Sequence, residues 1–306
     1  MAEGLQHPTA HERAAAKASG SAAAASFRER WMMSQDGLKL YHRDYGDPLS
    51  PRTPLLCLSG LTRNSADFAD LAARHAGERR VLCPDYRGRG RSAYDANWRN
   101  YQPPIYVNDI AHLLTATDVH RVIVLGTSLG GLLAMGLSVL KPTMIAAVIL
   151  NDIGPDVVGG GIARILDYIG VDHAQPDWAS AAAYLRQLLP TLSIKTEEGW
   201  LKMARATYRA GEDGLLHFDW DVNLARPFAH ATSAIPDLWP YFRALRPVPT
   251  LAFRGALSDV LSAETFERMA LAKPNLERVT VAGVGHAPNF NEPDAATAVD
   301  AFIRRF

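Results

Sequence analysis

Short, nearly continuous apolar runs recur along the chain, with longer segments of mixed polarity between them. Such runs are typical of parallel strands that are buried on both faces. The intervening segments have the length and polarity of helices that cover a sheet. Strand-like runs occupy residues 55–58, 81–83, 122–125 and 145–150, and helix-like segments occupy residues 68–76, 105–117 and 129–140. The pattern predicts an α/β protein with a mostly parallel, doubly wound sheet.

A different pattern precedes the first buried run. Residues 38–45 alternate apolar and polar positions, and Asp36-Gly37 separates them from the apolar residues 31–33. Alternation around an Asp-Gly turn is typical of an antiparallel hairpin. We therefore expect a hairpin at one edge of the sheet.

The alternation of strands and helices stops between residues 155 and 247 and resumes with strand-like runs at 248–253 and 276–281. This insert looks helical and is rich in aromatic residues. Most large apolar side chains pack in an interior, so we expect a small core within the insert. An insert above a catalytic edge also contributes side chains to a pocket, and we take Trp178 and Trp239 as candidates for substrate contact.

Composition narrows the class of protein. The 306 residues include 32 basic and 32 acidic side chains, so no overall charge favours nucleic acid or an anionic membrane. The chain has no run of about 18 apolar residues, so no membrane span is predicted.

Cys57 and Cys83 lie inside apolar runs and read as buried thiols, which fits a reducing, cytoplasmic location. The alanine-rich residues 1–26 predict a disordered tail outside the fold.

The sequence Gly126-Thr127-Ser128-Leu129-Gly130 stands where a buried strand meets a helix. A serine with glycines two residues away on each side is typical of a nucleophile elbow. The chain turns so sharply there that side chains do not fit at the flanking positions, and the serine hydroxyl is exposed above the sheet. Ser128 is therefore the candidate nucleophile.

A serine hydroxyl needs a base and a carboxylate that orients the base. His286 follows the strand-like run 276–281 in the glycine-rich loop Gly283-Val284-Gly285, and it is the candidate base. Asp259 ends the polar turn after residues 248–253, so Ser128, Asp259 and His286 occur in the expected chain order. Asp152, just after residues 145–150, is the rival carboxylate. We rank Asp259 ahead of it.

Four motifs occur in an order that resembles the α/β-hydrolase superfamily from about residue 30 to residue 306. They are Leu58-Ser59-Gly60-Leu61-Thr62, Asp85-Tyr86-Arg87-Gly88-Arg89-Gly90-Arg91-Ser92, the elbow, and Gly285-His286. The resemblance is strongest to lid-bearing esterases, lactonases and carbon–carbon bond hydrolases. It implies an α/β-hydrolase core made of residues 27–154 and 248–306, with residues 155–247 as a helical cap inserted after the sixth strand.

The resemblance also implies the chemistry. The backbone amides of Leu61 and Leu129 are the expected oxyanion-hole donors. Ser59 stands where the superfamily often has histidine, and either a tuning or a bystander role remains open for it. Arg63 is a candidate for an anionic substrate group, with a loop ion pair as the alternative. The arginine-rich run 87–91 lacks a phosphate-loop lysine and reads as a structural turn.

We therefore expect a serine hydrolase that forms an acyl-enzyme with a small or medium-sized apolar or aromatic ester or lactone, without a metal or cofactor. The same triad serves carbon–carbon bond hydrolysis of a vinylogous diketone, which is the alternative reaction. A binding protein that retains the fold without turnover is the alternative of another class. The sequence specifies neither the substrate nor the oligomeric state.

Overall fold

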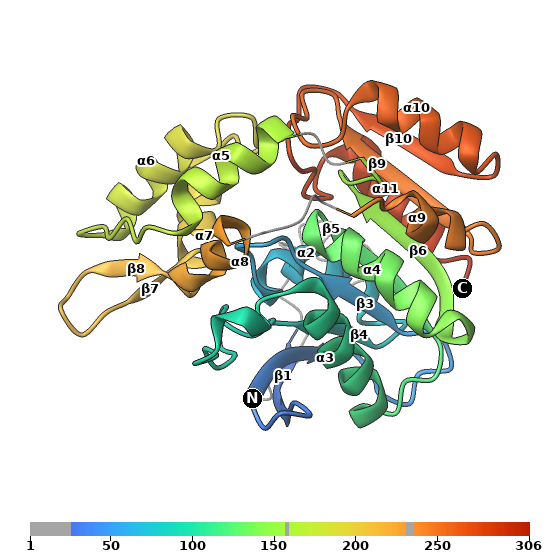
Figure 1. Ribbon diagram of the computed structural model, residues 1–306, viewed down its shortest axis with the longest axis horizontal. Coiled ribbons are helices and arrows are strands. Elements are labelled where there is room, and N and C mark those ends of the chain that lie inside the picture. The colour runs from blue at the N-terminus through green and yellow to red at the C-terminus, as the bar shows by residue number, and fades with distance from the viewer. Residues whose placement is uncertain (1–25, 157–158, 231–235) are drawn as a thin grey trace, which may run out of the picture.

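The computed structural model describes residues 26–156, 159–230 and 236–306, so nearly all of the predicted tail lies outside the described residues. An eight-stranded sheet forms its centre, in the order β1-β2-β4-β3-β5-β6-β9-β10 (Figure 1). Its strands are β1 (Phe27–Met33), β2 (Lys39–Tyr45), β3 (Leu55–Leu58), β4 (Val81–Pro84), β5 (Val122–Thr127), β6 (Ile145–Asn151), β9 (Thr250–Gly255) and β10 (Glu277–Val281).

The sheet is parallel from β4 to β10, and β2 pairs antiparallel with both β1 and β4. The predicted edge hairpin is thereby confirmed. Gly37 in its turn has a φ of 83°, a conformation that costs glycine little because it has no Cβ.

Alternate residues of each buried strand face opposite sides of the sheet, and each side has its own hydrophobic core. Helices α3 (Pro103–Ala116), α4 (Leu129–Leu140), α9 (Trp239–Ala244) and α10 (Ala263–Ala272) pack on one side. Helices α2 (Ala69–His75) and α11 (Pro293–Ile303) pack on the other. Short 3-10 turns are η1 (Ser65–Phe68), η2 (Trp98–Asn100) and η3 (Pro142–Met144). Both faces of the sheet are therefore covered, as the continuous apolar runs predict.

Between β6 and β9 the chain leaves the sheet and forms most of a separate lobe, seen in yellow-green to orange in Figure 1. Its elements are α5 (Gly159–Ile169), α6 (Trp178–Leu188), α7 (Glu197–Arg205), β7 (Tyr208–Ala210), β8 (Leu216–Phe218), η4 (Val222–Ala225) and α8 (Arg226–Ala229). The insert is thus not purely helical, because β7 and β8 pair as an antiparallel hairpin. Its last helix, α9, lies instead beside α4 on the core (Figure 1).

The strand register sets up one functional edge. Thr127 of β5 pairs with Asn151 of β6, and Asn151 pairs with Phe253 of β9. The residues that follow these partners, Ser128 and Asp152, therefore leave the sheet side by side at its carboxyl edge. Open parallel sheets place their ligands at this edge.

Candidate active site

Ser128 stands at a sharp turn between β5 and α4, with φ 53° and ψ −118°. This backbone conformation is costly for a residue with a side chain and persists only where the surroundings enforce it. A Cβ at Gly126 would lie 2.2 Å from the Gly130 carbonyl oxygen, and a Cβ at Gly130 would lie 2.1 Å from the Leu58 carbonyl oxygen. Only glycine fits at either position, so the strand and the helix can approach closely enough to form the elbow.

His286 contacts Asp152 and not Asp259. Its Nδ1 lies 2.6 Å from Oδ2 of Asp152, whose side chain is completely buried. The Gly255 amide donates to Oδ1 of Asp152 over 2.8 Å, and the Ser258 hydroxyl donates to Oδ2 over 2.6 Å. Hydrogen bonds of this kind satisfy a buried carboxylate and fix its orientation. The structure therefore reverses the ranking of the two carboxylates, because the one that contacts His286 is Asp152.

Asp259 has a different partner. Its carboxylate accepts hydrogen bonds from Nε and Nη2 of Arg164 on α5, over 3.0 and 3.2 Å. Partial burial of Asp259 favours its protonated form, but the hydrogen bonds and the positive charge of Arg164 together hold the pKa of Asp259 below its ordinary value. Asp259 thus links the insert to the core instead of supporting the base.

Asn151 joins the nucleophile and the histidine loop. Its Nδ2 donates to Oγ1 of Thr127 over 3.0 Å and to the carbonyl oxygen of Pro288 over 2.8 Å. Its own carbonyl oxygen accepts the Ser128 amide over 3.0 Å. One buried side chain therefore holds Thr127, next to the candidate nucleophile, and Pro288, two residues after the candidate base. Sequence reasoning did not identify Asn151.

The loop after β3 carries the first expected oxyanion donor. The Gly60 carbonyl oxygen accepts the Arg63 amide over 3.2 Å. In a trans peptide the N–H points opposite to the C=O, so the Leu61 amide points away from this turn. A Cβ at Gly60 would lie 3.8 Å from the Cβ of Ser128, which places the loop against the elbow. Ser59 closes the loop, since its hydroxyl donates to the Arg63 carbonyl oxygen over 3.1 Å.

The second expected donor is the Leu129 amide. Leu129 is the first residue of α4, and a first-turn amide has no acceptor within its own helix. Within the described ranges, neither this amide nor that of Leu61 is hydrogen-bonded to protein. Both amides are available to an oxygen of a bound substrate.

The three predicted substrate contacts have other partners in the structure. Arg63 donates to Asp67 and, over 2.5 Å, to the Thr207 hydroxyl of the insert, so the loop ion pair is what is observed. Trp178 begins α6, with the Arg205 guanidinium 4.9 Å from its ring. Trp239 is 9% exposed and donates from its indole to Asp156 over 2.7 Å. All three side chains are thus engaged in contacts within the protein.

Tyr168 of α5 is a buried aromatic residue of the insert near residues 59–63, the oxyanion loop. Burial raises the pKa of its hydroxyl, and an interaction with the Thr62 side chain partly opposes that rise. The ring also meets that of Trp220 edge to face, with centroids 6.2 Å apart. Trp220 stacks in turn on Phe218, which confirms a packed aromatic core within the insert.

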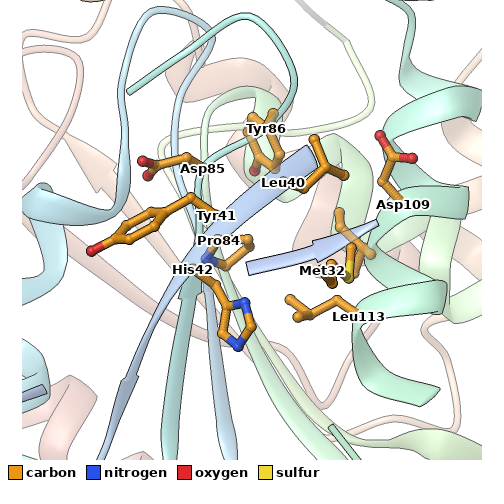
Figure 2. A pocket seen from close by; sticks show the side chains of 10 residues that line it. Met32, Leu40, Tyr41, His42, Pro84, Asp85, Tyr86, Asp109 and Leu113 are labelled. Atoms are coloured by element: carbon orange, nitrogen blue, oxygen red, sulfur yellow. The ribbon is translucent and has the colours of Figure 1, made fainter. Parts of the chain in front are cut away.

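Other features of the described chain lie outside this edge. Figure 2 shows a cavity of water size lined by residues of β2, β4 and α3, including His42, but by neither Ser128 nor His286. No cluster of metal-ligand residues occurs within the described ranges. No helix there is long and apolar enough to cross a membrane.

Arg87 is buried among three carboxylates, those of Asp36, Asp95 and Asp109, so this part of the arginine-rich run is structural as predicted.

Comparison with known proteins identifies the family. The model of the alpha/beta hydrolase family matches residues 55–301. The chain is an alpha/beta hydrolase. It is 36% identical, over 83% of its length and 89% of the relative's, to a 3-hydroxybutyrate-oligomer hydrolase from Cupriavidus necator. It is 25% identical, over 81% of its length and 87% of the relative's, to a 2-(acetamidomethylene)succinate hydrolase from Mesorhizobium japonicum.

Solved structures agree with this assignment. A crystal structure of an alpha/beta hydrolase from Novosphingobium aromaticivorans superposes with a TM-score of 0.86 at 42% identity, and the match covers 92% of this chain and 99% of the other. The predicted superfamily and fold class are confirmed. The hydrolase fold and its hydrolytic relatives also establish the broad class of enzyme.

Proposed function

We propose that this hydrolase cleaves carboxylic esters through an acyl-enzyme on Ser128, with His286 as the general base and Asp152 as the carboxylate that orients it. The hydrogen bond from His286 Nδ1 to the buried Asp152 carries the proposal, because it leaves Nε2 of the imidazole to accept the serine proton. The strained backbone of Ser128 presents the hydroxyl at the same sheet edge.

The reaction proceeds in two steps. Ser128 Oγ attacks the ester carbonyl carbon as His286 accepts its proton, and the carbonyl oxygen becomes an oxyanion near the Leu61 and Leu129 amides. Each such donor typically contributes about 3 kcal/mol to the transition state. The protonated histidine then gives its proton to the leaving alcohol. Water, activated by the same histidine, hydrolyses the acyl-enzyme.

Short esters of hydroxy acids are the substrates that we propose. The support is the 36% identity, over most of both chains, to a hydrolase of 3-hydroxybutyrate oligomers. The insert that covers residues 155–247 acts as the specificity cap in this proposal, with Tyr168 facing the oxyanion loop. Lactone cleavage and carbon–carbon bond cleavage need the same triad, so they enter the test as competing reactions.

Labelling and turnover test the proposal together. A fluorophosphonate should modify wild-type protein at Ser128, as located by peptide mass spectrometry, and should leave Ser128→Ala unmodified. Wild-type protein should release monomer from 3-hydroxybutyrate dimers and trimers faster than it turns over a lactone or a vinylogous diketone. Labelling at another residue would refute the nucleophile, and preferred cleavage of the diketone would refute the ester assignment.

A further inference from the structure

Arg89 is a buried cation beside the oxyanion loop. Its side chain is completely buried, and its guanidinium donates to three neutral groups: the Leu61 carbonyl oxygen, the Arg87 carbonyl oxygen over 2.8 Å, and the Tyr106 hydroxyl over 3.1 Å. It also lies 4.8 Å from the ring centroid of Tyr106. No carboxylate in the described part of the chain pairs with it. Buried charges are normally paired, so an unpaired one calls for an explanation.

The guanidinium holds the carbonyl that follows the oxyanion donor. Nε of Arg89 binds the Leu61 carbonyl oxygen, and the Tyr86 hydroxyl binds the Ser59 carbonyl oxygen over 3.1 Å. The Gly60–Leu61 peptide, which carries the donor N–H, lies between these two fixed carbonyls. An oxyanion donor is effective only when it is already oriented before charge develops.

The charge itself has a second effect. A positive group in a low-dielectric interior stabilises nearby negative charge more strongly than it would in water. An oxyanion at the Leu61 amide is the negative charge that arises during the proposed reaction. No carboxylate of the described residues forms an ion pair with Arg89, so no direct partner neutralises its charge.

We propose that Arg89 is a positioning residue for the oxyanion loop and that its charge favours the tetrahedral intermediate. This inference rests on the proposed serine hydrolase function. The sequence predicts only a structural turn for residues 87–91, and the proposal gives Arg89 of this turn a role in catalysis.

Arg79 provides a matched control. It is also a buried arginine, it donates to the Thr53 carbonyl oxygen over 2.9 Å, and it lies at the amino edge of the sheet before β4. Replacing Arg79 or Arg89 with methionine removes a buried guanidinium and keeps much of the apolar stem. Comparing Arg79→Met with Arg89→Met therefore separates a loss of fold stability from a loss of catalysis.

The experiment compares Arg89→Met, Arg89→Lys and Arg79→Met with wild type in kcat, KM, thermal melting and affinity for a boronic acid that forms a tetrahedral adduct with Ser128. Arg89→Met should lower kcat and boronate affinity in parallel by about 10- to 100-fold with KM nearly unchanged, somewhat less than the loss of a direct donor. Arg89→Lys should recover part of the loss. Arg79→Met should change only the melting temperature.

Two results would overturn the inference. One is an Arg89→Met protein with kcat and boronate affinity no lower than those of Arg79→Met. The other, which applies even if Arg89→Met does not fold, is an Arg89→Lys protein with unchanged kcat and boronate affinity, since lysine cannot reproduce the guanidinium geometry. Failure of wild type to label at Ser128 or to cleave esters would instead refute the proposed function.

Discussion

In the proposed mechanism, Asp152 is the residue whose environment affects the chemistry most directly. It follows β6 with a φ of 55°, so its backbone is held in a left-handed conformation. Its buried carboxylate accepts hydrogen bonds from Gly255 and Ser258 as well as contacting His286. A carboxylate fixed in this way selects one tautomer of the imidazole and stabilises the imidazolium that forms during attack.

Replacing the two rival carboxylates tests this assignment. Asp152→Asn should lower kcat on a p-nitrophenyl ester by about 10⁴-fold, because the amide favours the wrong imidazole tautomer. Asp259→Asn should stay within a few-fold of wild type, because it removes only a partly exposed ion pair with Arg164. Steady-state kinetics of both variants provide the comparison. A larger loss in Asp259→Asn would return the role to Asp259.

The two carboxylates differ in what a sequence can show about them. Ser128 and His286 are predictable because each stands in a local motif. Asp152 and Asp259 both follow apolar strands, and both fit the chain order Ser, Asp, His. The choice depends on strand register, which places Asp152 next to Ser128, and on Arg164, which binds Asp259 from a distant part of the chain. Neither contact leaves a local signal.

At the scale of elements, close packing of β5 against α4 fixes the elbow. Gly126→Ala should lower the melting temperature strongly and abolish activity, because its Cβ would overlap backbone atoms of Gly130 and Gly131. Gly77→Ala is the matched control, since a Cβ there meets no atom within 4 Å. Thermal melting and fluorophosphonate labelling of the two variants test the idea. Equal stability of the two variants would contradict this account of the elbow.

The insert presents a second prediction at this scale. Trp239→Ala should destabilise the fold by about 3 kcal/mol, as loss of a buried tryptophan does, and should change all ester rates by one factor. Tyr168→Ala should instead alter the ratio of rates across an ester series, because Tyr168 faces the Thr62 side chain. Denaturant unfolding and an acyl-length series separate the effects. A selectivity change confined to Trp239→Ala would reverse the two roles.

The elements of the core could be predicted better than those of the insert. Buried strands such as β5 and β6 appear as apolar runs, and the glycines around Ser128 indicate the turn. The three-residue strands β7 and β8 are too short for a periodic signal, and they form only by pairing with each other. The packing of α9 on α4 likewise depends on the tertiary fold, so the sequence assigns Trp239 to the insert's pocket.

At the scale of the whole molecule, the buried His42 and the partly buried Asp219 have opposite effects on the pH dependence of stability. Burial lowers the pKa of His42 from 6.5 to about 4, and both ring nitrogens lack a hydrogen-bond partner within the described structure. Partial burial and the charge of Asp85 raise the pKa of Asp219 from 3.8 to about 7. Between about pH 4 and pH 7 the folded protein therefore keeps His42 neutral and Asp219 protonated.

The signs follow from the protons bound in each state. From pH 6.5 down to 4 the unfolded chain protonates His42 first, so this residue makes the protein less stable as pH falls. From pH 4 up to 7 the unfolded chain loses the Asp219 proton first, so this residue makes the protein less stable as pH rises. Each contribution is on the order of 3 kcal/mol, so the two largely cancel in wild type.

Single variants should therefore reveal a pH dependence that wild type hides. Asp219→Asn mimics the protonated carboxyl, so it should exceed wild type in free energy of unfolding at pH 7.5 and approach it at pH 4.5. His42→Phe mimics the neutral ring, so it should exceed wild type at pH 4.5 more than at pH 7.5. Urea unfolding at both pH values measures the four differences. Suppose instead that each variant differs from wild type in free energy of unfolding by the same amount at both pH values. The pKa values of His42 and Asp219 are then not shifted in the folded protein as described here.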